Sequence, residues 1–358
     1  MVELKKVNLG DIITFKNGKK KPAEEGTIPI YGGNGILGYT DRSNYKNCIA
    51  VGRVGAYCGS VYYEPGECWI SDNAIAATPK ADVDIYFAFY LLKSLNLNQR
   101  HIGTSQPLLT QEILNKIECQ IPDLDIQKKI SNILRTMDGK VECNTAINRN
   151  LQEQAVTLYK EMIIDCADDR WSDGVLSDIA IITMGQSPKG DTYNETGDGT
   201  VFYQGRGEFG DRFPTRRLYT SDPKRMAQTN DVLMSVRAPV GDFNVAYENC
   251  CIGRGLASIR SKDKHQSYIL YTIVSIQDAL NMYNGEGTVF GSINKDALNG
   301  IQIVIPPVSV MDEFENIVEP LDESIKRNYE EICRLTNLRD ALLPKLMSGE
   351  LDVSDIDI

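Results

Sequence analysis

Residues 125–165 read DIQKKISNILRTMDGKVECNTAINRNLQEQAVTLYKEMIID, and this stretch decides the fold. Its apolar residues recur first at intervals of four, three, four and four, which places them on one stripe of an α-helix. They are Ile126, Ile130, Ile133, Met137, Val141, Leu151, Leu158 and Met162. About 40 residues at 1.5 Å per residue make a rod of roughly 60 Å. A soluble helix of this length needs a partner that covers its stripe.

A second apolar stripe, between Asp312 and about Met347, supplies that partner. Its members are Phe314, Val318, Leu321, Ile325, Ile332, Leu335, Leu342 and Leu346. A short strand-like run ending in proline precedes each helix, at 117–122 (IECQIP) and 301–306 (IQIVIP), and proline ends a strand. We expect the two helices to pack as an antiparallel coiled coil. The alternative is two separate bundle helices, each covered by its own domain.

The segments before the two helices resemble one another, which indicates a duplicated unit. The matching pairs are 30–35 (IYGGNG) with 202–207 (FYQGRG), 49–53 (IAVGR) with 233–237 (LMSVR), and 86–91 (YFAFYL) with 268–273 (YILYTI). Arg53 and Arg237 are 184 residues apart, and so are Pro122 and Pro306 at the ends of the two units. Short β-branched runs broken by Gly, Asn and Asp predict mostly β structure in each unit. One helix is expected in each, around 84–95 and 266–280.

These patterns predict an α+β fold with an internal pseudo-twofold repeat. Two mostly-β domains with small helices are joined by two long antiparallel α-helices that form a coiled coil. The predicted segments are a first domain at 1–122, a central spacer helix at 123–168, a second domain at 169–306, a C-terminal spacer helix at 307–350 and a tail at 351–358.

Length and composition favour a cytoplasmic protein of two domains. The chain has 358 residues, no apolar run long enough to span a membrane, and an N-terminus without the apolar core of a signal peptide. Its nine cysteines lack C-x-x-C spacing, and it has only two histidines. We therefore expect reduced thiols and no metal site.

The acidity of the chain is concentrated near its end. The net charge is −11, and residues 307–358 carry 5 Lys and Arg against 13 Asp and Glu. Residues 1–122 carry 13 against 12, and residues 169–306 carry 14 against 16. Both predicted domains are thus near neutral and compatible with a local basic face. The acidic last helix suits a protein partner better than DNA.

Catalytic signatures are missing from the sequence. It contains no G-x-x-x-x-G-K-[ST] phosphate loop, no Asn-Pro-Pro-aromatic motif of an adenine methyltransferase and no G-x-S-x-G elbow. Asp123, Asp125 and Lys128 loosely match the acidic and lysine cluster of a nuclease, but they stand at the start of a helix, where aspartate is a good cap. We expect no catalytic residues.

Binding chemistry remains. Arginine can bridge guanine N7 and O6, lysine mostly neutralises phosphate, amides and hydroxyls in Gly-rich loops suit base edges, and tyrosine can pack on sugar or backbone. The DNA-binding candidates are Lys19, Lys20, Lys21, Tyr31, Asn34, Arg53, Tyr57, Gln106, Tyr203, Gln204, Arg206, Arg212, Arg216, Arg217, Arg237 and Ser292. For each the alternative is a solvated surface loop, and for Arg53 and Arg237 a structural ion pair is an equal alternative.

Several stretches match a known family. They are 103–122 (GTSQPLLTQEILNKIECQIP) leading into 125–138 (DIQKKISNILRTMD), 232–260 (VLMSVRAPVGDFNVAYENCCIGRGLASIR), 291–307 (GSINKDALNGIQIVIPP) and 338–352 (LRDALLPKLMSGELD). In this order, at both repeats and over nearly the whole chain, the sequence resembles the specificity (S) subunit of type I restriction–modification enzymes.

The resemblance implies a function without catalysis. Each domain would be a target recognition domain that reads one half of a bipartite double-stranded DNA site, and the helices would be spacers that dock two modification subunits. Those subunits carry S-adenosylmethionine-dependent adenine methylation. Restriction subunits, which carry ATP-driven translocation and cleavage, join the assembly. S-adenosylmethionine, ATP and Mg would therefore bind the partners, and this chain would hold no cofactor.

The rod length agrees with such a reader. Half-sites about one helical turn apart, roughly 34 Å, face one side of the duplex, and a spacer of about 60 Å allows that separation. The spacer would act as a ruler for the gap. Two other functions are kept as alternatives: a stand-alone nuclease or methyltransferase with an unusual site, and a coiled-coil scaffold whose duplicated domains bind protein or glycan.

Overall fold

The computed structural model describes residues 3–103, 106–168, 170–285 and 291–356. Thr104 and Ser105 of the quoted stretch 103–122, and Asp169 at the predicted start of the second domain, lie outside these ranges. The chain divides into two compact units: unit 1 holds residues 1–143 and 331–358, and unit 2 holds residues 144–330. Within the described ranges no helix is both long and apolar enough to cross a membrane.

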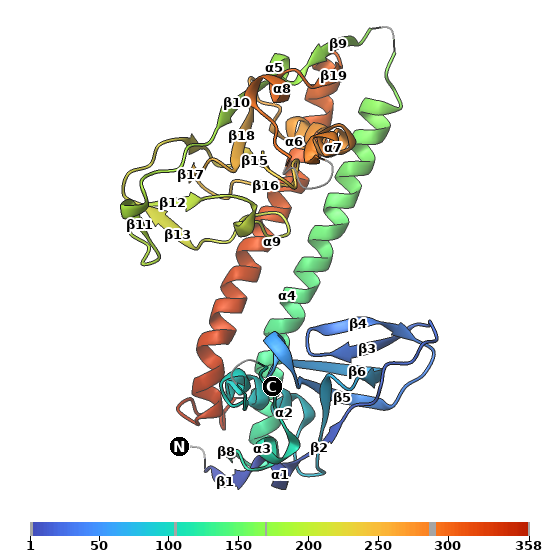
Figure 1. Cartoon of the computed structure of the whole chain (residues 1–358), viewed down its shortest axis with the longest axis vertical. Helices are drawn as coiled ribbons and strands as arrows, with labels where there is room; N and C mark the ends of the chain where they lie inside the picture. Colours follow the sequence, from blue (N-terminus) through green and yellow to red (C-terminus); the bar gives the residue numbers. More distant parts are fainter. Residues whose placement is uncertain (1–2, 104–105, 169, 286–290, 357–358) are drawn as a thin grey trace. The chain divides into compact units, whose positions relative to one another are not determined.

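Both predicted long helices are present (Figure 1). Helix α4 spans Leu124–Tyr159 and continues into a π-helical turn, η3, at Lys160–Ile164; helix α9 spans Val308–Met347. The side chain of Asp123 accepts a hydrogen bond from the N–H of Ile126 at 3.0 Å. Asp123 therefore caps α4, which confirms the cap interpretation over the nuclease one.

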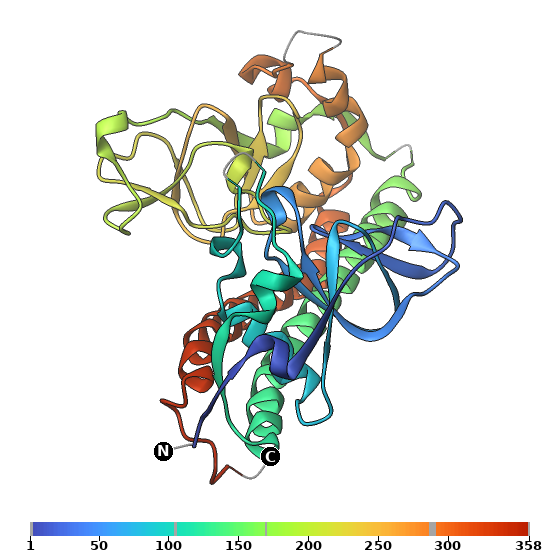
Figure 2. The same cartoon turned by 60° about the horizontal axis from the view of Figure 1, so that its bottom comes forward.

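The two long helices pair antiparallel inside each unit (Figures 1 and 2). In unit 1, Arg339 of α9 lies 2.6 Å from Asp138 of α4. In unit 2, the amide of Asn328 donates to Asn148 at 2.8 Å. A second contact in each unit gives the direction: Lys140 pairs with Glu331 in unit 1, and the ring of Tyr159 contacts that of Phe314 in unit 2. In each unit the partner number falls on α9 as it rises on α4, so the pairing is antiparallel. Each segment also packs against the domain of its unit, as the alternative required.

Unit 1 is built on a six-stranded sheet in the order β2-β7-β5-β6-β3-β4. These strands are β2 Ile13–Asn17, β7 Ala74–Pro79, β5 Tyr45–Gly52, β6 Val61–Ile70, β3 Ile28–Gly32 and β4 Gly35–Thr40. All pairs are antiparallel except β3 with β6. A separate antiparallel pair joins β1 (Lys5–Asn8) to β8 (Glu118–Ile121), the strand predicted before the first long helix.

Short helices of unit 1 close the core between the sheet and α4. They are α1 Leu9–Ile12, η1 Gly55–Tyr57, α2 Ile85–Ser94, η2 Leu97–Gln99 and α3 Gln111–Asn115. Asp84 caps α2 by accepting from the N–H of Phe87 at 2.9 Å. Apolar residues of the sheet and α2 pack on the first turns of α4, against Ile126 and Ile130 of the predicted stripe and against Leu134, which was not assigned to that stripe. The predicted helix at 84–95 is confirmed.

Unit 2 repeats the plan with two smaller sheets. One has the order β10-β18-β15-β16 and the other β11-β13-β12-β17-β14. Their strands are β10 Ala180–Met184, β18 Leu256–Ser261, β15 Val232–Ser235, β16 Phe243–Val245, β11 Tyr193–Asn194, β13 Leu218–Thr220, β12 Thr200–Tyr203, β17 Cys250–Ile252 and β14 Met226–Ala227. The antiparallel pair β9 (Ser172–Val175) and β19 (Gln302–Ile305) mirrors β1 and β8.

The helices of unit 2 include one change from prediction. They are α5 Leu176–Ile179, η4 Gly190–Thr192, η5 Arg206–Glu208, α6 Gln266–Ser275, α7 Gln277–Asn281, η6 Met282–Asn284 and α8 Lys295–Asn299. The single helix expected at 266–280 is two, interrupted at Ile276. The core between the sheet, α6 and α9 contains Tyr268, Tyr271 and Phe314.

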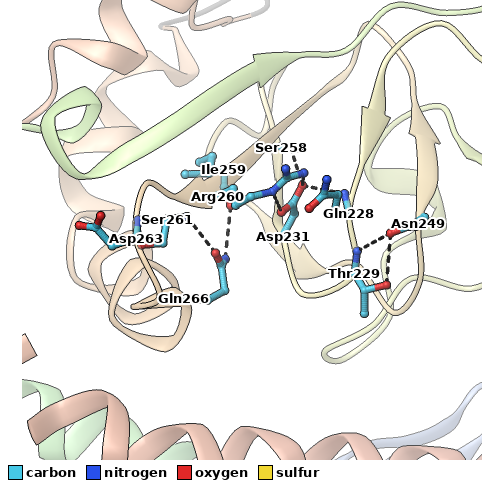
Figure 3. A network of polar contacts seen from close by, with 10 residues as sticks. All are labelled: Gln228, Thr229, Asp231, Asn249, Ser258, Ile259, Arg260, Ser261, Asp263 and Gln266. Carbon is cyan, nitrogen blue, oxygen red and sulfur yellow. Dashed lines mark hydrogen bonds and ion pairs between the residues drawn. The ribbon is translucent and has the colours of Figure 1, made fainter. Parts of the chain in front are cut away.

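An ion pair with a buried carboxylate connects the residue before β15 to β18 in unit 2 (Figure 3). Asp231, which is 1% exposed, accepts two hydrogen bonds from Arg260, at 2.6 and 2.8 Å, and one from Ser258 at 2.9 Å. The N–H of Gln228 adds a fourth at 2.8 Å. All four contacts go to one carboxylate, so its charge is compensated inside the domain.

The internal repeat extends to individual backbone hydrogen bonds. In unit 1 the parallel pairing aligns Tyr31 of β3 with Ile70 of β6, and in unit 2 it aligns Tyr203 of β12 with Ile252 of β17. The carbonyl of Tyr31 accepts from the N–H of residue 71 at 2.9 Å, and that of Tyr203 from the N–H of residue 253 at 2.8 Å. The predicted duplication is therefore confirmed at the level of single residues.

Candidate nucleic-acid interface

In unit 1, the loops that follow β2, β5 and β6 meet at one end of the strands. The N–H of Lys19 donates to the carbonyl of Ile70 at 3.0 Å, and the N–H of Arg53 donates to that of Asn73 at 3.0 Å. Loops are the usual carriers of recognition because a rigid sheet positions them. This end of unit 1 is therefore its candidate interface.

The unit 1 candidates fall mostly on this surface. Gln106 joins it because the next residue, Pro107, accepts a hydrogen bond from the N–H of Gly55 at 3.0 Å. Asn34 stands in the two-residue turn between β3 and β4. The exposed candidates of unit 1 are Lys19, Lys20, Lys21, Asn34, Tyr57 and Gln106.

Two tyrosine candidates are not available to DNA. Tyr31 is 7% exposed, and its hydroxyl donates to Glu64 at 3.0 Å; burial, together with the carboxylate of Glu64, raises its pKa. Tyr203 is 0% exposed, and burial raises its pKa as well. Both are inward-facing residues at the ends of strands, where alternation turns every second side chain into the core. The prediction that these two tyrosines pack on sugar or backbone is wrong because both are buried.

In unit 2, three exposed candidates meet around a hollow of about 240 Å³. Gln204, Arg206 and Arg237 line it, from the loops after β12 and β15. The whole lining, called the arginine hollow below, is Ser187, Gln204, Gly205, Arg206, Ser235, Arg237, Ala238, Arg254 and Gly255. No carboxylate belongs to this lining. Ser292, also exposed, pairs by its backbone with Arg237.

Sequence reasoning missed two members of the arginine hollow, Ser187 and Arg254. The N–H of Arg254 donates to the hydroxyl of Ser187 at 3.2 Å, which joins the loop after β10 to the turn between β17 and β18. The signal was present: Gly253-Arg254-Gly255 repeats the Gly-Arg-Gly pattern of residues 205–207. Arginine between two glycines at a strand end therefore occurs twice in unit 2, at Arg206 and at Arg254.

Three arginine candidates lie outside the hollow. Arg212 is 8% exposed, pairs with Asp322 of α9 and contacts the hydroxyl of Tyr271. Burial alone would lower the pKa of Arg212, but Asp322 and Tyr271 raise it above its ordinary value, so the guanidinium stays charged. Arg212 therefore has a structural role.

Arg216 and Arg217 are exposed but already paired. Arg216 forms an ion pair with Glu248, and Arg217 lies 2.8 Å from Glu208. Burial alone would lower the pKa of Arg216, but the carboxylate of Glu248 raises it above its ordinary value. The carboxylate of Glu208 raises the pKa of Arg217. A carboxylate that must first be displaced weakens the attraction of either arginine for DNA.

The predicted equivalence of Arg53 and Arg237 is wrong by one residue. The N–H of Arg53 donates to the carbonyl of Asn73, just before β7; the N–H of Val236 donates to that of Gly255, just before β18, at 3.0 Å in both cases. Arg53 therefore corresponds to Val236. Successive strand residues face opposite sides, so Arg237 is exposed whereas Arg53 is half-buried, with its Nε buried and unpartnered among the described residues.

The structural ion pair considered for these two arginines is not found. Neither Arg53 nor Arg237 lies within ion-pair distance of an acidic residue in the ranges that the structure describes. The same ranges contain no cluster of three or more His, Cys, Asp or Glu side chains that could hold a metal ion. All nine cysteines are free thiols.

Comparison with known proteins identifies a family in both halves of the chain. The model of the type I restriction modification DNA specificity domain matches residues 1–153 and again residues 168–334. The MjaX specificity subunit of a type I restriction enzyme from Methanocaldococcus jannaschii is 29% identical over 298 residues, covering 76% of this chain and 70% of the relative. The MjaIX specificity subunit from the same organism is 25% identical over 319 residues, covering 78% and 72%.

A solved structure shares the fold. The S subunit of a type I restriction–modification system from M. genitalium superposes with a TM-score of 0.68 at 18% identity, covering 97% of this chain and 96% of that one. At this identity the likeness concerns the fold alone. Together with the family match, it confirms the resemblance that the sequence indicated and does not favour the scaffold alternative.

Proposed function

Because the chain belongs to the family of the type I restriction modification DNA specificity domain, it is a non-catalytic DNA-specificity subunit, and we propose that each of its units reads one half of a bipartite double-stranded DNA site. The observation that carries this proposal is the recurrence of one loop arrangement. In both units the loops after corresponding strands meet at one end of the sheet and present exposed polar side chains.

The two interfaces contain some side chains that suit phosphate contacts and others that suit base contacts. Lys19, Lys20 and Lys21 suit the phosphate backbone, because lysine acts on it as a point charge. Asn34 and Gln106 offer amides to base edges. In unit 2 the arginine hollow supplies both guanidinium and amide donors. Tyr57 and Ser292 remain as contacts at the rims.

We assign the recognition domains to residues 1–122 and 169–306, and the spacers to 123–168 and 307–350. The antiparallel helices set the gap between half-sites and dock two modification subunits; restriction subunits join that complex. The acidic surface of α9 favours such protein contacts. Under this proposal S-adenosylmethionine, ATP and Mg bind the partner subunits, and the complex works in the cytoplasm, where its free thiols stay reduced.

The near-neutral domains imply that tight DNA binding needs the partner subunits to close around the duplex. Domains of nearly zero net charge attract the phosphate backbone weakly, so the isolated chain should bind DNA weakly and lose binding with added salt. Fluorescence anisotropy with a duplex, with and without the modification subunit, measures this. Strong, salt-resistant binding by the chain alone would contradict the closure model.

The function itself is tested by purification with the neighbouring methyltransferase subunit. The complex should form, and it should transfer labelled methyl groups from S-adenosylmethionine to adenine in DNA of selected sequence only. The modification subunit without this chain is the control, and it should show no sequence selection. A failure of the two chains to associate, or methylation independent of this chain, would return the scaffold function to consideration.

A further inference from the structure

We propose that the arginine hollow of unit 2 reads a guanine in its half-site through Arg237 and Arg254, and that the equivalent surface of unit 1 reads its half-site without arginine. This inference rests on the proposed function and adds the base chemistry of each half. It also makes Arg254, together with Arg237, a specificity-determining residue.

The first support is the pairing of charges. Residues 171–306 contain eight arginines, of which Arg206, Arg212, Arg216, Arg217 and Arg260 each pair with a carboxylate. Among the described residues Arg225, Arg237 and Arg254 have no such partner. Two of these three unpaired guanidinium groups line the same hollow, whose lining has no carboxylate. Like charges held together in this way favour a ligand rich in acceptors.

The second support is the shape of the hollow. Around Gly205 and Gly207 there is open space where a side chain would begin, so a base edge can approach the backbone closely. Gln204 and Ser187 place an amide and a hydroxyl beside the guanidinium groups. The planar guanidinium fork matches the N7 and O6 acceptors of guanine, whereas a phosphate alone would not use this mixed set of groups.

The third support is the contrast with unit 1. The hydrogen bonds that align Arg53 with Val236 also align Val54 with Arg237, because Val54 and Arg237 are the next residues along. Residues 71 and 253 make equivalent hydrogen bonds, so the residues that follow them, Asp72 and Arg254, are equivalent as well. Asn34 stands where unit 2 has Arg206. Unit 1 thus offers valine, aspartate and asparagine at these places.

These side chains predict a different half-site for unit 1. Asparagine pairs bidentately with adenine N6 and N7, and aspartate accepts from cytosine N4, while none of the three suits guanine N7 and O6. The backbone arrangement is repeated but the reading groups are not. The two half-sites should therefore differ in sequence, with arginine-read guanine in the half that belongs to unit 2.

The test uses the complex with its modification subunit and the site that it methylates. Each guanine of that site is replaced in turn by 7-deazaguanine, which lacks only the N7 acceptor. One substitution in the unit 2 half should then lower the affinity roughly 10- to 150-fold, as expected for the loss of one of the two charged hydrogen bonds of a bidentate pair. The half-site whose methylated DNA sequence changes in the Arg237→Ala complex is assigned to unit 2. The half-site whose methylated sequence changes in the Asn34→Ala complex is assigned to unit 1.

Lysine variants separate a base contact from a phosphate contact. Arg237→Lys and Arg254→Lys keep the charge but lose the fork, so a guanine contact predicts relaxed selection at one position, and a phosphate contact predicts nearly unchanged selection. Arg225→Ala removes an exposed, unpaired arginine outside the hollow and is the matched control. It should leave selection unchanged.

The outcomes distinguish this inference from the function on which it rests. If the wild-type complex has a bipartite site but no guanine in it is sensitive to 7-deazaguanine, or if both lysine variants keep full selection, the guanine proposal is wrong and the proposed function stands. If the wild-type complex selects no sequence at all, the proposed function itself fails.

Discussion

Buried carboxylates stabilise unit 2, and among the described residues Asp231 is the least exposed of them. Its four hydrogen bonds come from Arg260, Ser258 and the backbone of Gln228. A buried carboxylate without such partners would be strongly unfavourable. Asp231 directly precedes β15 and Arg260 lies near the end of β18, whereas the loop after β15 and the turn before β18 contribute to the arginine hollow. The stabilising ion pair and the arginine hollow therefore lie at opposite ends of the same two strands.

Asp231→Asn should destabilise unit 2 by about 2–3 kcal/mol. The amide cannot satisfy the guanidinium of Arg260, and the loss is below that of a fully buried pair because Arg260 is one-third exposed. Urea unfolding measures the change. Asp263→Asn, an exposed aspartate nearby in Figure 3, is the control and should cost less than about 0.5 kcal/mol. Equal effects of the two variants would contradict this role for Asp231.

A second buried acid gives a pH dependence. Glu315 is 6% exposed and accepts from the N–H groups of Ser267 and Tyr268, at 2.9 and 3.0 Å, at the start of α6. Burial raises the pKa of Glu315 above its ordinary value of 4.5, although these hydrogen bonds oppose the rise. The folded state therefore binds a proton more tightly than the unfolded state does.

Stability should consequently fall as pH rises from about 4.5 through the raised pKa of Glu315. Glu315→Gln removes this slope, because glutamine does not titrate. The measurement is the difference in unfolding free energy between wild type and Glu315→Gln between about pH 4 and pH 8. The wild type should lose stability relative to the variant across the window. A relative gain would show that the hydrogen bonds outweigh burial.

At the scale of elements, each long helix anchors its domain with the same residue. Asp138 of α4 accepts from the hydroxyl of Tyr90 at 2.7 Å and pairs with Arg339. Asp322 of α9 accepts from the hydroxyl of Tyr271 at 2.9 Å and pairs with Arg212. The two aspartates are 184 residues apart, the offset of the repeat. The carboxylate thus occupies the same repeat position on both long helices, whereas its arginine partner comes from a different segment of the chain in each unit.

The two anchors should differ in strength. Arg212 and Asp322 are 8% and 18% exposed, against 21% and 22% for Arg339 and Asp138. Asp322→Asn should therefore cost about 3 kcal/mol and Asp138→Asn about 1–2 kcal/mol, because a buried cation that loses its partner costs more. Chemical unfolding of both variants tests the order. Glu323→Gln, whose exposed pair with Arg327 contributes little, is the control; a larger effect of Asp138→Asn would contradict the ranking.

The sequence predicted regular features well and side-chain environments poorly. A stripe that persists along α4 and α9 leaves little choice but a helix, and the cap at Asp123 follows from residue type alone. The direction of Tyr203 and the equivalence of Arg53 depend on strand register, where a shift of one residue exchanges the two faces. Arg254 meets Ser187 only after strands far apart in sequence have paired, and no local pattern fixes that contact.

At the scale of the whole molecule, the proposed ruler makes a quantitative prediction. Seven residues inserted into α4 after residue 143 and seven into α9 after residue 330 keep both stripes aligned. They lengthen the helices by about 10 Å, which corresponds to about three base pairs. The gap between half-sites should grow by that amount while both half-site sequences stay the same. An unchanged gap would show that the helices do not set it; insertion into one helix alone should abolish activity.

The central claim is that the two units read two separate half-sites. Single-molecule sequencing of genomic DNA methylated by the complex with the modification subunit tests it most directly. We predict one motif made of two short, different sequences separated by a gap of fixed length and free composition, with a methylated adenine in each half. A single continuous motif, or two halves at variable spacing, would contradict the claim.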